Sequence, residues 1–131
     1  MIEALMNAAQ RLTEALRAEN AALAQLDLGA AAELARGKRV AAEAFAAAFD
    51  ATQRAGCTAE GEERRRTEEI TLRLKDLTAE NRRLLERAIA LQSRVIETIA
   101  GALRPPGPGT YGHRGLAREG EATAVSIASR A

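Results

Sequence analysis

The fold of this chain is decided by residues 12–29, LTEALRAENAALAQLDLG. The leucines in this stretch lie three or four residues apart, a spacing that gathers apolar side chains along one face of a helix. The spacing stops at Asp27, whose short acidic side chain suits the cap position that opens a following helix. The stretch therefore predicts the end of one helix, a tight turn, and a second helix that folds back on the first.

Outward from this turn, an apolar stripe with heptad spacing runs in each direction. The first stripe comprises Ile2, Leu5, Ala9, Leu12, Leu16, Glu19, Leu23 and Leu26, and the second comprises Ala31, Leu34, Lys38, Ala41, Phe45, Ala48 and Thr52. Such stripes are typical of helices that pack against a partner helix. We therefore expect an antiparallel hairpin of two helices, over about residues 2–26 and 28–54.

One charged residue interrupts each stripe, and the geometry of a hairpin brings the two charges together. Facing residues of a hairpin have numbers with a constant sum, so Leu23 faces Leu34 and Glu19 faces Lys38. An ion pair at this layer would fix the register of the two helices, although desolvation offsets much of its attraction. The alternative is that both charges lie at exposed helix edges, where ion pairs contribute little.

A third, longer helix is predicted from about residue 62 to residue 103, after a connector that contains Gly56 and Gly61. Its main stripe comprises Ile70, Leu74, Leu77, Asn81, Leu84, Ala88, Leu91, Val95 and Thr98, and a second one comprises Leu85, Ile89, Ile96, Ile99 and Leu103. The polar Asn81 within the main stripe is the kind of residue that specifies helix alignment. The two stripes together make an apolar face wider than one partner helix would cover.

The helix pattern ends at a proline- and glycine-rich segment, because all three prolines of the chain lie within residues 105–108. Residues 110–131 carry few bulky apolar groups and cannot bury enough surface to fold alone. We therefore predict an all-α protein with an N-terminal antiparallel helical hairpin and a long third helix, in a three-helix bundle or coiled coil. A helical domain would span residues 1–104. Residues 105–131 would form a Pro/Gly hinge and a flexible tail, disordered or conditionally helical.

The composition excludes several classes of function. The chain has 131 residues, with 19 Lys and Arg against 18 Asp and Glu, and this balance argues against nucleic-acid binding. Its one cysteine and one histidine exclude an internal disulfide and a zinc site. No arrangement of residues indicates catalysis, a metal or another cofactor. No segment is apolar over the length of a membrane span, and we expect a cytoplasmic protein without stable membrane insertion.

Several short patterns, taken in order along the chain, resemble the family of FlgN-type flagellar type III export chaperones. They are Leu12-x-x-x-Leu16-x-x-Glu19-x-x-x-Leu23, Leu26-Asp27-Leu28, Leu34-x-x-x-Lys38, Asn81-x-x-Leu84-Leu85-x-x-Ala88 and Thr110-Tyr111-Gly112-x-x-Gly115. The resemblance extends from about residue 5 to the end of the chain. It implies a chaperone that binds the C-terminal segments of the hook-filament junction proteins FlgK and FlgL, and that brings them to the export gate protein FlhA.

Under this resemblance the wide apolar face would receive an amphipathic helix of the client protein. The expected client-binding residues are Leu85, Ile89, Ile96, Ile99, Leu103, Leu116 and Ile127, the last two from the tail. Tyr111 matches the tail tyrosine of the family and is expected to dock on the export gate. Glu19, Lys38 and Asn81 are expected to set the register of the helices.

A second interpretation is a non-enzymatic structural protein, either a self-associating coiled coil or an amphipathic coat protein. Pairing of two client-free copies as a homodimer would also cover the wide apolar face. Such a protein would form discrete oligomers or bind lipid without any client.

Overall fold

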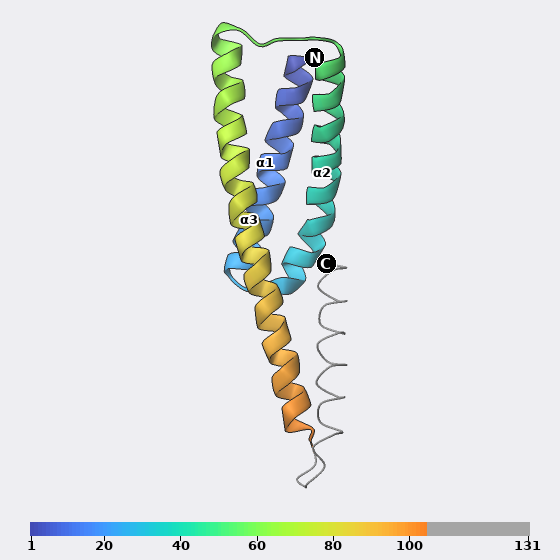
Figure 1. Cartoon of the computed structure of the whole chain (residues 1–131), viewed down its shortest axis with the longest axis vertical. Coiled ribbons are helices and arrows are strands. Elements are labelled where there is room, and N and C mark those ends of the chain that lie inside the picture. The colour runs from blue at the N-terminus through green and yellow to red at the C-terminus, as the bar shows by residue number, and fades with distance from the viewer. Residues whose placement is uncertain (105–131) are drawn as a thin grey trace. The chain divides into compact units, whose positions relative to one another are not determined.

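A computed structural model, which describes residues 1–104, contains three helices and no strand within that range (Figure 1). The helices are α1 (Ile2–Ala24), α2 (Leu28–Arg54) and α3 (Gly61–Ala102). The prediction of an all-α protein with a helical hairpin and a long third helix is confirmed. The chain divides into two compact units, of which the first is Met1–Leu84 and the second begins at Leu85.

The turn between α1 and α2 is as tight as the sequence predicts. The Asp27 side chain accepts a hydrogen bond of 3.1 Å from the backbone N–H of Ala30 and so caps α2. Two backbone bonds close α1, from Leu26 N–H to Leu23 O (3.0 Å) and from Asp27 N–H to Ala22 O (2.9 Å). This pair of bonds is a Schellman motif.

The predicted end of the first helix, at Leu26, was wrong by two residues. The helix ends at Ala24, and Leu26 takes a left-handed backbone conformation with φ 58°. Its side chain is consequently 41% exposed and does not continue the apolar stripe. A non-glycine residue at this position of the motif is disfavoured by contact between its Cβ and the backbone.

The same motif closes α2, but there the left-handed position is a glycine. Gly56 has φ 64°, its N–H bonds to Gln53 O (3.1 Å), and the N–H of Cys57 bonds to Thr52 O (3.3 Å). A second left-handed glycine, Gly61 with φ 57°, is the first residue of α3. Both glycines of the connector therefore occupy positions that other residues rarely adopt.

Within Met1–Leu84, α1 and α2 run antiparallel, and the first part of α3 runs alongside them in the direction of α1 (Figure 1). The core cluster of this unit consists of Ala9, Leu16 and Leu74, and the partly buried side chains packed against it are Leu12, Phe45, Ile70 and Leu77. Alanine at core positions gives narrow helices that pack closely. All seven residues belong to the stripes that the sequence predicts.

The buried surface of α1 is wider than one stripe, because α1 contacts both other helices. Thr13 is 0% exposed and Asn20 is 5% exposed, and both lie one position after a residue of the predicted stripe. The Thr13 hydroxyl donates to Ala9 O (2.9 Å), so its burial leaves no unpaired donor. The sequence analysis missed both residues because they are polar.

Candidate functional site

The ion pair predicted across the hairpin is present in the first unit. Lys38 Nζ lies 2.9 Å from Glu19 Oε1, so the charged residues that interrupt the two stripes do face each other. Glu19 is 1% exposed, whereas the Lys38 side chain reaches the surface and is 24% exposed. The role of this pair in fixing the register stays a prediction.

Asn81 of α3 joins the pair and connects all three helices. Its side-chain Nδ2 donates to Glu19 Oε1 (3.0 Å) and to Asn20 Oδ1 (2.8 Å), and its Oδ1 accepts from Lys38 Nζ (3.2 Å). Both donors of the amide are therefore used. Asn20 in turn donates through Nδ2 to Leu77 O (3.2 Å), one turn before Asn81 on α3. We call Glu19, Asn20, Lys38 and Asn81 the polar layer.

The polar layer connects side chains of all three helices through one ion pair and several hydrogen bonds. Its one unsatisfied atom is Glu19 Oε2, which is buried and has no hydrogen-bond partner among the described residues. The layer contains a single carboxylate, and acid–base catalysis requires groups with separated roles and access to a substrate. Within residues 1–104, no group of three or more His, Cys, Asp or Glu side chains could hold a metal ion.

The second feature is the set of exposed apolar residues on the last part of α3, which we call the C-terminal face. Four large side chains are exposed there: Ile89 (40%), Val95 (49%), Ile99 (54%) and Leu103 (78%). Of the client-binding residues expected from the sequence, Ile89, Ile99 and Leu103 belong to this set, while Leu85 and Ile96 are half-buried. Val95 was placed in the other stripe. Leu116, Ile127 and Tyr111 lie outside the described residues.

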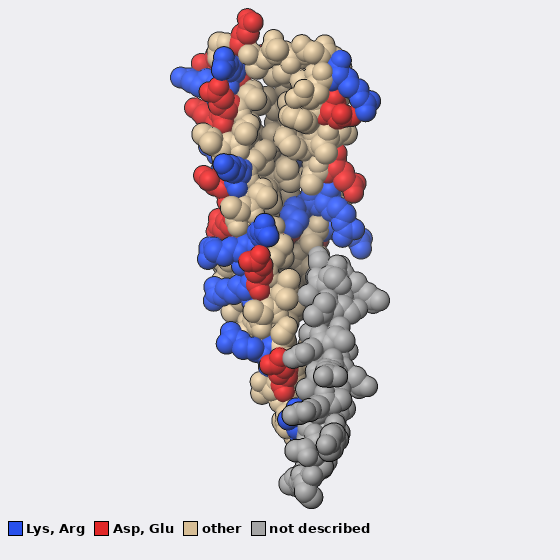
Figure 2. Space-filling model, in the orientation of Figure 1, with Lys and Arg blue, Asp and Glu red and all other residues tan. Residues whose placement is uncertain are grey.

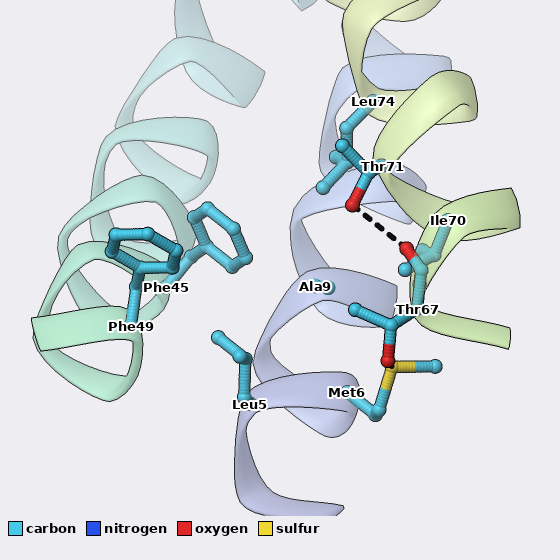
Figure 3. A pocket seen from close by; sticks show the side chains of 9 residues that line it. All are labelled: Leu5, Met6, Ala9, Phe45, Phe49, Thr67, Ile70, Thr71 and Leu74. Atoms are coloured by element: carbon cyan, nitrogen blue, oxygen red, sulfur yellow. Dashed lines mark hydrogen bonds between the residues drawn. The ribbon is translucent and has the colours of Figure 1, made fainter. Parts of the chain in front are cut away.

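The third feature is an apolar cavity of about 210 Å³ in the first unit, between all three helices (Figure 3). It is lined by Leu5, Met6, Ala9, Phe45, Phe49, Thr67, Ile70, Thr71 and Leu74. The two phenylalanines of the chain both line it, with ring centroids 6.3 Å apart, and Phe49 is 48% exposed. The sequence analysis did not single out this cavity, because Phe49 lies outside the predicted stripe.

The hydroxyls of the cavity's two threonines both donate to backbone oxygens of their own helix. Thr67 Oγ1 donates to Glu63 O (2.8 Å), and Thr71 Oγ1 donates to Thr67 O (2.7 Å), as Figure 3 shows for the second bond. A hydroxyl bonded to the preceding turn of its own helix has no donor left for a ligand. The cavity therefore favours an apolar occupant.

Comparisons of the chain with protein-family models, with curated proteins and with solved structures found no match. In the part of the chain that the structure describes, no helix combines the length and the apolar composition required to cross a bilayer.

Proposed function

We propose that this protein is a cytoplasmic export chaperone of the FlgN type. It would hold the C-terminal helical segments of the junction proteins FlgK and FlgL, prevent their premature association, and deliver them to FlhA at the type III export gate. The proposal is carried by one observation, the exposed apolar side chains of the C-terminal face. The family assignment itself depends on the sequence patterns given above.

The physical basis is the substitution of one helix for another. Subunits that pair through amphipathic helices in an assembled filament expose an apolar surface while they are free, and this surface invites association. A chaperone helix with an uncovered apolar face can occupy that surface, in the manner of a helix bound in a groove. Burial of a large apolar side chain contributes about 1.5 to 3 kcal/mol when it is complete. The four side chains of the C-terminal face are 40–78% exposed, so each would contribute about the corresponding fraction of this free energy when a client helix covers it.

The tail has two roles in this proposal. Leu116 and Ile127 would add to the client contact, and the free energy required to order them would keep the complex releasable. Tyr111 would dock on the export gate once a client is bound. A Tyr111→Ala protein should therefore capture client normally and secrete it poorly. Normal secretion by this variant would contradict the docking role.

The deciding experiment is co-expression with the C-terminal segments of the two junction proteins, followed by copurification. The variant I96E/I99E should lose capture while circular dichroism shows unchanged helicity. The matched control is A90E/G101E, which adds the same charges at exposed positions on the opposite side of α3 and should retain capture. Undiminished capture by I96E/I99E would move the client site elsewhere.

The structural alternative, a self-associating or coat protein, uses the same exposed side chains in another way. It predicts discrete oligomers in sedimentation velocity, or cosedimentation with anionic vesicles, when no client is present. A monomer that binds neither vesicles nor itself, and that captures the junction segments, would support the chaperone.

A further inference from the structure

Figure 2 shows a groove between α2 and α3, and the cavity of the first unit lies at one end of it. At this end Leu5 and Ala9 of α1 form the floor, and Phe49 of α2 and Thr71 of α3 stand on opposite sides (Figure 3). At the other end the Lys38–Asn81 hydrogen bond joins α2 to α3. Between these two ends, each of the two helices carries a row of exposed residues that borders the groove. We call these rows the edges of the groove.

The two edges can be defined by helical spacing. On α2 the edge is Phe49, Ala46, Ala42 and Arg39, and on α3 it is Thr71, Lys75, Thr78 and Arg82. All eight residues are exposed. Because α2 and α3 are antiparallel, Arg39 and Arg82 lie at the end marked by the polar layer, and Phe49 and Thr71 lie at the cavity.

The charge along these edges has a direction. The cavity end carries no charged residue, the polar-layer end carries Arg39 and Arg82, Lys75 lies between, and none of the eight edge residues is acidic. Figure 2 shows the same trend, with uncharged surface between α2 and α3 that gives way to Lys and Arg side chains along the groove. The small side chains of Ala42 and Ala46 would allow close approach of another backbone.

We propose that this groove receives an amphipathic helix of a partner protein, with an acidic C-terminal end at Arg39. The edges extend over about three helical turns, roughly 15 Å, which is the length of a short helix. An apolar floor with an apolar pocket at one end selects a helix with bulky apolar side chains on one face. The negative end of the helix dipole, a free carboxylate and acidic side chains all favour the basic end.

This groove is independent of the proposed chaperone function. It consists of residues of Met1–Leu84 and shares no residue with the C-terminal face, so either surface can fail its test while the other passes.

The probe is an alanine-based peptide of about 14 residues, with leucines at helical spacing, two glutamates at its C-terminal end and a free carboxylate. Binding to the full-length chain is measured by fluorescence anisotropy. A control peptide of the same composition carries the glutamates at its N-terminal end and an amidated C-terminus. Acids near the N-terminus stabilise an isolated helix, so weaker binding by the control cannot result from lower helicity. We expect it to bind about tenfold more weakly, the effect of two or three modest charge contacts.

Two pairs of variants locate the site. Phe49→Ser should weaken binding about tenfold through loss of apolar contact, while Val40→Ser, at a 62% exposed position of the same helix, should not change it. R39E/K75E should weaken binding of the first peptide, while R11E/R73E changes as much charge at exposed positions away from the edges and should leave it nearly unchanged. All of the residues changed in these variants are exposed in the native chain. Thermal unfolding of each variant confirms that it folds.

The proposal is overturned if the first peptide does not bind, if both peptides bind equally, or if Val40→Ser weakens binding as much as Phe49→Ser. It is also overturned if the chain alone forms a dimer in sedimentation velocity that Phe49→Ser abolishes. That result would identify a second copy of this chain as the occupant.

Discussion

The two stretches of α3, before and after Leu84, differ in which side chains they bury: the first buries a polar side chain, and the second exposes apolar ones. In the first stretch Asn81 is 6% exposed, and its amide is held by residues of α1 and α2. In the second stretch Ile99 is 54% exposed and Leu103 is 78% exposed. Exposure along this helix is therefore decided by the groups available to cover each side chain, and not by the hydrophobicity of the side chain. A buried amide is tolerated where every donor finds an acceptor.

The largest expected effect comes from placing a second carboxylate in the polar layer. Lys38→Glu would remove the cation that neutralises buried Glu19 and add a like charge, so we expect a loss of about 3 kcal/mol or more in the free energy of unfolding. Urea denaturation measures this loss. Lys75→Glu, at an exposed position, should change stability by no more than about 0.5 kcal/mol.

The double reversal E19K/K38E sharpens this prediction. It restores opposite charges, so it should be more stable than Lys38→Glu alone. Recovery should be partial, because Asn81 would have to turn its amide over, and its Oδ1 would then face Asn20 Oδ1. Asn20 cannot readily follow, since its own amide donates to Leu77 O. If a double-mutant cycle shows no coupling energy between residues 19 and 38, the ion pair does not fix the register of the two helices.

A smaller effect is expected when the two stretches exchange their unusual residues. Asn81→Leu makes the chain more apolar, yet it should lower the free energy of unfolding by about 2 kcal/mol, because Glu19 and Asn20 lose a donor. Ile99→Asn makes the chain more polar but should cost less than about 0.5 kcal/mol, because the side chain is already half in water. If Ile99→Asn proved the more destabilising in thermal unfolding, the contrast between the two stretches would be wrong.

The next largest effect on stability is expected at Gly56, in the connector that precedes α3. Gly56→Ala should lower the free energy of unfolding by about 1 kcal/mol, because Gly56 has a left-handed backbone. Gly101→Ala, within the second stretch, replaces a helical glycine with open space around its Cβ and should be neutral or slightly stabilising. Equal losses for both variants, measured in urea, would show that the conformation of Gly56 is not what matters.

The smallest effect is expected at two threonines whose hydroxyls each donate to the backbone oxygen four residues earlier. Thr71 donates to Thr67 O (2.7 Å) in the first stretch, and Thr98 donates to Arg94 O (2.8 Å) in the second. Replacement of either by valine should change stability by no more than about 0.5 kcal/mol. Thr71→Val should nevertheless strengthen binding of the glutamate-ended peptide slightly, while Thr98→Val leaves it unchanged. The opposite order in anisotropy titrations would count against the groove.

The sequence predicted the hairpin well, because a tight turn relates each residue of α1 to one residue of α2. Asp27 identifies the turn, and the spacing rule then brings Glu19 to Lys38 without further information. No such rule relates α3 to the hairpin, because the connector of residues 55–60 permits many alignments. Asn81 was recognised as a polar residue in a stripe, but its contact with Glu19 could not be foreseen.

The second buried stripe of α1 was predictable in principle. Met6, Thr13 and Asn20 are spaced seven residues apart, which is the signal of a helix that contacts a second partner. Hydrophobicity alone hid this signal, because two of the three residues are polar. The cavity at Phe49 depends on how far α2 and α3 stand apart above α1, and no local pattern in the sequence encodes that distance.

The tight turn also determines where this chain can change length. The N–H of Asp27 bonds to the last turn of α1, and its side chain caps the first turn of α2. The same residue therefore belongs to both helix ends, and the turn cannot absorb an extra residue. One residue inserted there would rotate all of α2 by about 100° and bring Gly37 to the layer now held by Lys38. Insertions and deletions should therefore accumulate in residues 55–60 and be eliminated at residues 25–27.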